Sequence, residues 1–151
     1  MIGIISDTHG LLRPEALDAL KGSRLIVHAG DIGSLDVVEG LADLAPVIAI
    51  RGNVDRGEWA GKFPPTATRE MEGRRFHVLH DLKEIDFDPA AARIDLVISG
   101  HSHKPDVHYQ DGVLYVNPGS AGPRRFRLPI SIATLWLTPS GMEARVHALS
   151  V

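Results

Sequence analysis

The chain has 151 residues, 44% of them hydrophobic and 23% charged, which is typical of one globular domain with its own core. The absence of cysteine excludes disulfides, thiolate zinc sites and a cysteine nucleophile. With 16 basic against 19 acidic residues, the formal net charge of −3 provides no polybasic footprint for nucleic acid or an anionic membrane. No apolar run reaches the roughly 18 residues of a membrane span, and the N-terminus lacks the basic region of a signal peptide. We expect a single cytoplasmic domain over residues 1–151.

The first fifty residues alternate between predicted strands and helices. Short apolar runs predict strands at residues 2–6, 24–30 and 46–52. Helices are predicted at 14–22, with Pro14 in the first turn, and at 34–45, with Ser34 as N-cap. The second helix is expected to present Leu35, Val38, Leu41 and Leu44 on one face. Such alternation is typical of βαβ units around a parallel sheet.

The rest of the chain changes to hairpins. Hairpins are predicted at 66–80, turning near Gly73, at 106–117, turning at Asp111-Gly112, and at 130–149, turning at 138–141. A buried strand is predicted within 92–100. The two halves together predict an α/β protein of mixed sheets, packed face to face with helices outside.

Side chains that can bind a metal, namely carboxylates, imidazoles and one amide, follow the ends of five predicted strands. They are Asp7, His9, Asp31, Asn53, His80, His101 and His103. Because the carboxyl ends of parallel strands share one edge of a sheet, these side chains are expected to converge. Imidazoles, carboxylates and an amide oxygen suit borderline divalent metals such as Mn, Fe, Zn, Co or Ni. Seven ligands are too many for one ion, but they fit two ions if one carboxylate bridges them.

Each of these residues alone has an ordinary explanation. Gly30-Asp31 and Gly52-Asn53 are turn dipeptides, and an isolated histidine is usually structural. The remaining histidines are not expected to bind the metal: His28 would be structural or would support a ligand from behind, and His77, His108 and His147 lie outside the pattern. The joint pattern nevertheless favours a metal site, because all seven residues fall at predicted strand ends in a chain with eight histidines.

The motifs SDTHG, AGDIG, RGNVD, LHD and GHSH, in this order, resemble those of the calcineurin-like metallophosphoesterases. The resemblance is to the small bacterial and archaeal phosphodiesterases of the YfcE type, and it extends from Ile2 to about Val146. It implies a four-layer αββα sandwich, in which two mixed sheets are flanked by helices and a two-metal centre lies at one edge.

The resemblance also implies which residues bind each ion. One ion would be bound by Asp7, His9, Asp31 and His103, and the other by Asp31, Asn53, His80 and His101, with Asp31 bridging. Mn²⁺ is the first choice, and Ni²⁺, Fe²⁺, Zn²⁺ and Co²⁺ remain open. His101 and His103 are expected to point into one crevice, because side chains two apart in an extended segment share a face. Supporting or phosphate-binding roles are expected for Asp55, Arg51 and Asn117.

The implied activity is hydrolysis of a small phosphodiester, such as a nucleotide or cyclic nucleotide. Two cations about 3.5–4 Å apart would turn a water into hydroxide, which attacks phosphorus in line. Asp31, Asn53 and His101 are the expected catalytic residues. The expected partner is a small organic phosphate, rather than nucleic acid or a membrane, and a homo-oligomer stays open. A non-catalytic scaffold and metal-regulated nucleotide binding without turnover are the alternatives.

Two positions depart from the family pattern. Val54 stands where many members of the superfamily have a histidine, which is the expected acid for the leaving group. Asp81 stands where many close relatives have glycine after the histidine that corresponds to His80. Its carboxylate would either strengthen the second metal site or repel the phosphate, and the sequence leaves both outcomes open.

Overall fold

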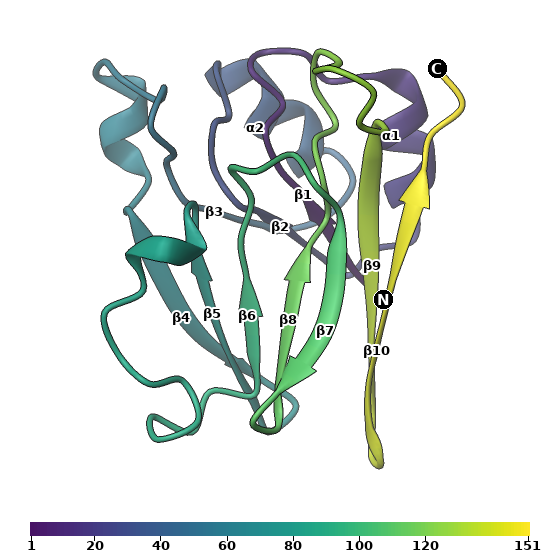
Figure 1. Cartoon of the computed structure of the whole chain (residues 1–151). Coiled ribbons are helices and arrows are strands. Elements are labelled where there is room, and N and C mark those ends of the chain that lie inside the picture. Colours follow the sequence, from purple (N-terminus) through teal and green to yellow (C-terminus); the bar gives the residue numbers. More distant parts are fainter.

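The computed structural model describes residues 1–151, which form two mixed sheets of five strands packed face to face (Figure 1). The first sheet has the order β10-β9-β1-β2-β3. Its three parallel strands are β1 (Ile2–Ile5), β2 (Leu25–His28) and β3 (Val47–Ala49), and its antiparallel strands are β9 (Ser131–Thr138) and β10 (Gly141–Ala148).

The second sheet has the order β4-β5-β6-β8-β7. The three central strands are parallel to one another, and each edge strand is antiparallel to its neighbour. Its strands are β4 (Thr66–Met71), β5 (Arg74–Leu79), β6 (Leu96–Ile98), β7 (Asp106–Gln110) and β8 (Val113–Asn117). The three predicted hairpins are therefore confirmed, with turns at 72–73, 111–112 and 139–140.

The main core lies between the sheets, and the alternation of side chains along β1 explains it. Ile2 and Ile4 point into a cluster of 15 buried residues shared by both sheets, whereas Ile5 points the other way, into a cluster of 11 beneath the helices. Gly3 also faces the helices, where an added Cβ would lie 2.5 Å from the Leu20 side chain. Strand β1 is thus buried on both faces, as its continuous apolar sequence predicts.

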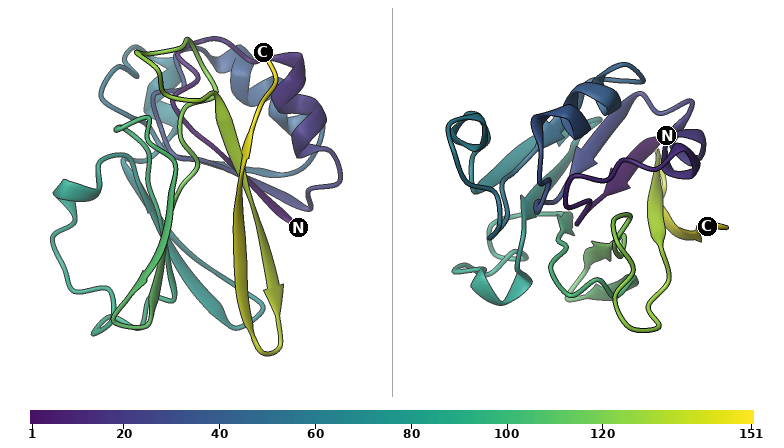
Figure 2. Two further views of the ribbon diagram at one scale, coloured as in Figure 1. Left: turned by 45° about the vertical axis from the view of Figure 1, so that its right-hand side comes forward. Right: turned by 90° about the horizontal axis from the view of Figure 1, so that it is seen from above.

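Helices α1 (Pro14–Leu20) and α2 (Leu35–Ala42) cover the outer face of the first sheet (Figure 2). Ser34 is the N-cap of α2, as predicted, because its Oγ accepts the N–H of Asp36. The predicted apolar face of α2 is confirmed in part: Leu41 is buried and Val38 and Leu44 pack against the same core, but the second fully buried residue is Val37, which the prediction omitted. Leu35 is only the first helical residue and Leu44 lies beyond the helix end, so the i, i+4 pair in the middle of the helix faces the sheet.

The layer over the second sheet is thin. No α-helix covers it; a 3₁₀ turn η2 (Leu82–Glu84) and the irregular segment 85–95 pack there through Leu82, Ile85 and Phe87. A further 3₁₀ turn, η1 (Trp59–Lys62), follows β3 in the chain, and its Trp59 packs against the core beneath the helices. The expected two-sheet sandwich is confirmed, whereas the outer layer of the second sheet is formed by η2 and segment 85–95 instead of the α-helices of a four-layer αββα arrangement. No helix of this chain has both the length and the apolar character needed to cross a bilayer.

Candidate metal centre

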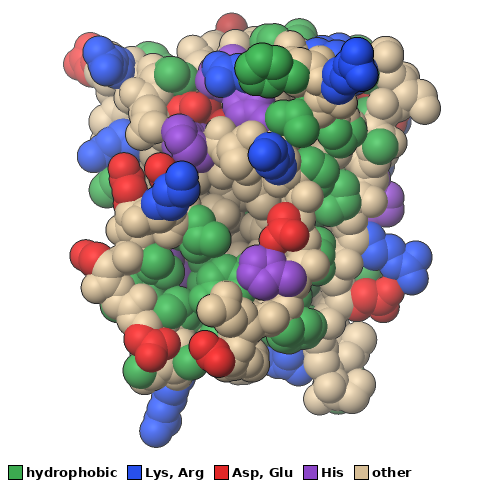
Figure 3. Space-filling model, in the orientation of Figure 1, with side chains coloured by type: hydrophobic (Ala, Val, Ile, Leu, Met, Phe, Trp, Pro, Cys, Tyr) green, Lys and Arg blue, Asp and Glu red, His purple; other side chains and the backbone are tan.

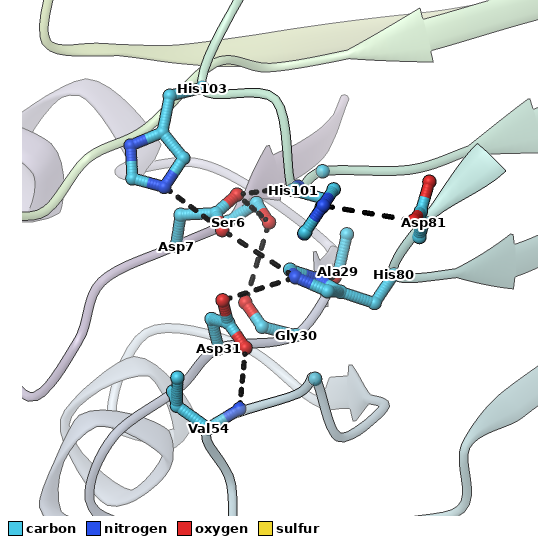
Figure 4. Close-up of polar contacts among 12 residues, drawn as sticks. Ser6, Asp7, Ala29, Gly30, Asp31, Val54, His80, Asp81, His101 and His103 are labelled. Carbon is cyan, nitrogen blue, oxygen red and sulfur yellow. Dashed lines mark hydrogen bonds and ion pairs between the residues drawn. The ribbon is translucent and has the colours of Figure 1, made fainter. Parts of the chain in front are cut away.

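The ends of strands from both sheets meet at the upper edge of the molecule in Figure 1, and the candidate metal-binding side chains lie there (Figure 4). They form two groups, in each of which the potential ligand atoms lie within 4.8 Å of one another. The first group contains Asp7, His9 and His103, and the second contains Asp31, His80 and His101. The edge is therefore shared by two sheets, so each group combines residues from both.

The carboxylate of Asp31 lies between the two groups. Its Oδ2 is 3.1 Å from Nε2 of His80 in its own group and 3.8 Å from Nε2 of His9 in the other. Oδ1 of Asp7 is 3.4 Å from Nε2 of His103 and 3.8 Å from Nε2 of His80. Asp31 and Asp7 thus each face both groups, and the bridging role that the resemblance implies for Asp31 stays a prediction.

Several of these polar atoms are buried without a hydrogen-bond partner. They are Oδ1 of Asp7, Nε2 of His9, Nε2 of His80 and Nδ1 of His103, and the first three face one another across the site. An unpaired buried polar atom destabilises the fold by about 1–3 kcal/mol, so three such atoms that face one another indicate a shared binding partner. Carboxylate oxygens and imidazole nitrogens are the donors that borderline divalent metals prefer. The residues present therefore fit a pair of divalent cations.

The remaining polar atoms of these side chains are used to orient them. Oδ2 of Asp7 accepts hydrogen bonds from Oγ of Ser6 (2.7 Å) and from the N–H of His101 (3.1 Å), which leaves Oδ1 free. Oδ1 of Asp31 accepts the N–H of Val54 (3.1 Å), which leaves Oδ2 free. Nδ1 of His80 donates to the carbonyl of Ala29 (2.8 Å), so Nε2 faces the site.

Nε2 of His80 and Oδ2 of Asp31, which are 3.1 Å apart but outside hydrogen-bond geometry, form a buried ion pair. Burial raises the pKa of Asp31, but contact with His80 and the N–H of Val54 outweigh it and lower the pKa to about 2. Burial lowers the pKa of His80, but Asp31, the carbonyl of Ala29 and Asp7 outweigh it and raise the pKa to about 9. At neutral pH, a proton thus occupies Nε2 of His80, where a metal would bind.

Left-handed backbone conformations gather at this edge. Of the nine non-glycine residues with positive φ, five are candidate ligands: Asp7, His9, Asp31, His101 and His103. Such conformations are uncommon and tend to cluster at functional sites. The prediction of an extended segment around His101 is therefore wrong, since His101 (φ 71°) and His103 (φ 62°) are both left-handed. As a result His103 is buried, whereas the side chain of His101 is 44% exposed.

Motif glycines let the site loops approach one another. A Cβ on Gly52 would collide with the backbone and carboxylate of Asp31, and a Cβ on Gly100 would collide with Oγ of Ser6 and lie 2.7 Å from Oδ2 of Asp7. The glycines of the RGN and SGH motifs are therefore required by packing against the candidate ligands.

Asp55 and Asn117 hold the loops of the site together through hydrogen bonds. The buried carboxylate of Asp55 accepts the N–H groups of Ile32, Gly33 and Gly52, which ties the loop after β2 to the loop after β3. Nδ2 of Asn117 donates to the carbonyl of Gly100 (3.0 Å), and its Oδ1 accepts the N–H of Gly119 (2.9 Å). These contacts agree with the predicted supporting role and leave a phosphate-binding role for Asn117 without support.

Asn53 and Arg51 lie at a smaller hollow on the same edge. Both line a pocket of about 240 Å³ together with His80. Asn53 is exposed, and Arg51 donates from Nη1 to the carbonyl of Phe63 (2.6 Å). Asn53 thus shares this hollow with His80, and its role as a ligand stays a prediction.

The structure adds two site residues that the sequence did not single out, Ser6 and Ala29, and shows what Asp81 contacts. Ser6 and the carbonyl of Ala29 orient Asp7 and His80. Oδ2 of Asp81 lies 3.7 Å from Nε2 of His101, while its Oδ1 accepts the N–H of Lys83 at the start of η2. Asp81 therefore contacts His101, not the adjacent His80. The role of the Ala29 carbonyl could not be predicted, because every residue has a backbone carbonyl. Ser6 could have been found, because it directly precedes the predicted ligand Asp7.

The remaining histidines lie outside the two groups. Burial lowers the pKa of His28 to about 4, so this ring is neutral; its Nδ1 accepts the N–H of Gly30 and its Nε2 contacts Thr8. His77 contacts Thr68, and His147 contacts Thr134. His108 contacts Asp106 and stacks on Tyr115.

Comparison with known proteins agrees with this geometry. The model of the calcineurin-like phosphoesterase superfamily domain matches residues 1–139, and the chain belongs to this superfamily. A probable metallophosphoesterase of Methanothermobacter thermautotrophicus is 33% identical, over 97% of this chain and 91% of that protein. The phosphodiesterase YfcE of Escherichia coli is 30% identical, over 76% of each chain.

Solved structures show the same fold. An archaeal phosphodiesterase is 25% identical with a TM-score of 0.74, covering 97% of this chain and 99% of that one. The structure of YfcE from Escherichia coli is 26% identical with a TM-score of 0.65, covering 87% and 86%. Vps29 of Chaetomium thermophilum has a TM-score of 0.78 over 99% and 97% at 14% identity, and this likeness concerns the fold alone.

Proposed function

We propose that this protein hydrolyses small phosphodiesters with the help of two divalent cations. One would be held by Asp7, His9, Asp31 and His103, and the other by Asp31, Asn53, His80 and His101. The observation that carries the proposal is the set of buried, unpaired ligand atoms facing one another around Asp31. The relatives named phosphodiesterase support the class of substrate.

Within this proposal, the protein's own residues orient and hold the reacting groups. Two bound cations would supply an activated water and neutralise charge on the phosphate oxygens. Asp31 sets the spacing of the two groups, and the carbonyl of Ala29 fixes the imidazole of His80. Asn53 and His101 are exposed at the edge, where their side chains can reach a bound phosphate. Mn²⁺ remains the first choice of metal.

The test is hydrolysis of bis(p-nitrophenyl) phosphate by the purified chain. We expect added Mn²⁺ to raise the rate, EDTA to remove it, and Asp31→Asn to abolish it, because the bridging charge is lost. Asp86→Asn is the matched control, since Asp86 is exposed on the segment over the second sheet. Activity that survives both EDTA and Asp31→Asn would contradict the proposal.

A scaffold function without catalysis is the alternative on this fold. The likeness to Vps29 concerns the fold alone, and all seven expected ligand positions are filled in this chain. Elemental analysis after reconstitution separates the two functions: we expect two metals per chain, and none would favour the scaffold. Two metals and nucleotide binding without product would favour regulated binding.

A further inference from the structure

The loop between β8 and β9 carries an exposed aromatic residue among three arginines. Its residues 123–127 read PRRFR. Phe126 is 93% exposed and has a left-handed φ of 53°, which is uncommon for a bulky residue. The turn is closed by the N–H of Leu128, which donates to the carbonyl of Arg125 (3.1 Å). The loop thus presents Phe126 to solvent at a conformational cost.

The cations around Phe126 have no acidic partner. Arg124, Arg125 and Arg127, together with the nearby Lys104, form no ion pair, and the one side-chain contact among them is that of Arg124 with the carbonyl of Leu128. Three other arginines of the surface, by contrast, each pair with a glutamate: Arg24, Arg75 and Arg145. The chain has a net charge of −3, but this patch is locally basic.

The basic loop stands directly beside the first group of candidate ligands. Gly122, where the loop begins, packs so tightly that an added Cβ would collide with the carbonyl oxygen of Asp7. On its other side the loop meets Lys104, which follows His103 in the chain and lines a hollow with Phe126, Arg127 and Leu128. In Figure 3, Lys, Arg and hydrophobic side chains lie along the upper edge of the molecule, next to histidines.

The larger cleft on the other side of the centre has a different charge. It has a volume of about 850 Å³ and contains His101. Its lining includes Lys83 and two carboxylates, Asp81 and Asp106, which contact His101 and His108; Lys104 lies at its border with the hollow beside Phe126 and pairs with neither carboxylate. The loop is therefore the side of the centre where unbalanced positive charge lies.

We propose that the substrate is a nucleotide with at least two phosphates, and that this loop and Lys104 bind the part of it that extends beyond the reacting phosphate. A single phosphodiester has one negative charge, which the two cations of the proposed function would already neutralise, so four further cations indicate additional phosphates. Phe126 offers a face on which a base can stack, and arginines beside it can bind the neighbouring phosphates. The inference rests on the proposed function for the position of the reacting phosphate.

The test is binding of a fluorescein-labelled phosphorothioate hexathymidylate, measured by anisotropy with the Mn²⁺-loaded chain and again in EDTA. Because each neutralised phosphate of a single strand contributes about −0.7 to the slope of log K against log salt, four contacts predict a slope near −3. Replacing all three arginines by glutamine should reduce this slope to about −1. Phe126→Ala should weaken binding by roughly 5- to 100-fold and Phe126→Trp should restore it, as expected for stacking.

Matched controls lie away from the loop. Trp136→Ala removes another exposed aromatic residue and Arg69→Gln another exposed cation, and neither should change the affinity. Competition by unlabelled dithymidylate and hexathymidylate separates the two sources of this chemistry: equal competition indicates a dinucleotide, and stronger competition by the hexamer indicates a longer strand.

Equal affinities of the wild type and the loop variants would overturn the inference. The inference would also be overturned if the loop variants kept their affinity for the oligonucleotide but lost binding to phosphatidylserine vesicles, because the loop would then be a membrane contact. The outcome is separable from the proposed function. Loop-dependent binding without any hydrolysis would refute the hydrolase alone, and metal-dependent hydrolysis without loop-dependent binding would refute this inference alone.

Discussion

At the scale of single residues, the site depends on which atom of each side chain is already used. Asp7 and Asp31 each bind a backbone N–H with one carboxylate oxygen and keep the other free. His80 donates from Nδ1 and keeps Nε2 for the site. In this way the backbone groups that hydrogen-bond the ligand side chains, and not the ligands alone, determine the directions in which the unpaired atoms point.

The proton on His80 predicts how metal uptake depends on pH. Its pKa in the folded protein is about 9, above the unfolded value of about 6.5, so this proton stabilises the metal-free fold below pH 6.5 and the contribution is lost as pH rises through 9. A metal at Nε2 must displace it, so affinity should rise with pH up to about 9.

Titration calorimetry in buffers of different ionisation enthalpy measures this proton. Between pH 6.5 and about 8, below the His80 pKa of about 9, we expect uptake of the second ion to release close to one proton from His80, and His80→Gln to remove that release. Uptake with no proton release in the wild type would contradict the assigned contact between His80 and Asp31.

Val54 predicts a strong dependence of rate on the leaving group. It stands where many superfamily members have a histidine, it is 50% exposed, and its side chain cannot donate a proton. We therefore expect p-nitrophenyl esters to be cleaved far faster than alkyl esters. Val54→His should narrow this difference by at least ~10-fold, since general acids contribute about 10²–10⁴.

Rates for a series of phenyl and alkyl diesters, plotted against leaving-group pKa, measure the effect. Val54→Asn serves as the control, because it adds polarity without an acid of suitable pKa. A slope that is equally steep in Val54→His and the wild type would show that position 54 does not supply the acid.

At the scale of elements, the site is made by the turns that follow strands, and glycines set how closely these turns approach. Gly52 follows β3 and lies against Asp31, while Gly100 follows β6 and lies against Ser6 and Asp7. Residues with left-handed backbone conformations in the turns after β1, β2 and β6 direct neighbouring side chains to the two different groups of candidate ligands. The strands themselves supply alignment, and the chemistry lies just beyond their ends.

Gly52→Ala should therefore damage the site more than the fold. Its Cβ would push against Asp31, and overpacking of this kind costs about 1–3 kcal/mol. We expect metal affinity to fall by at least ~10-fold, because 1.4 kcal/mol corresponds to a factor of ten. Gly61→Ala is the control, since nothing lies within 4 Å of that position. Equal metal affinity in both variants, measured by calorimetry, would contradict the packing argument.

Much of this arrangement could be predicted from the sequence, because strands and tight turns are encoded locally. The apolar run of β1, the turn at Asp111-Gly112 and the polar residues after each strand are examples. The left-handed turn at His101 was not predictable, since it depends on Asp7, which is distant in sequence and binds the N–H of His101. The basic loop was missed because a net charge counts the whole chain and averages out a local cluster.

At the scale of the whole molecule, the candidate centre joins the two sheets. Asp7, His9 and Asp31 follow strands of the first sheet, whereas His80, His101 and His103 follow strands of the second. Each group contains members from both sheets. Bound cations would therefore connect the two halves of the sandwich at one edge, in addition to the hydrophobic core between them.

Metal binding should raise the melting temperature. A ligand at about 100 times its dissociation constant adds about 2.7 kcal/mol, which corresponds to roughly 5–10 °C for a domain of this size. Differential scanning calorimetry with Mn²⁺ and with EDTA measures the difference, and His103→Gln, which removes one link between the sheets, should reduce it. An equal melting temperature with and without metal would argue against a centre shared by both sheets.

The three hairpin turns at 72–73, 111–112 and 139–140 lie at the lower end of the molecule in Figure 1, opposite the metal-binding edge. The hairpin turns are thus separated from the candidate ligands by the length of the strands. A peptide tag or a small partner domain inserted at Asp111-Gly112 would extend from this lower end, leaving the edge that carries Asp31 untouched.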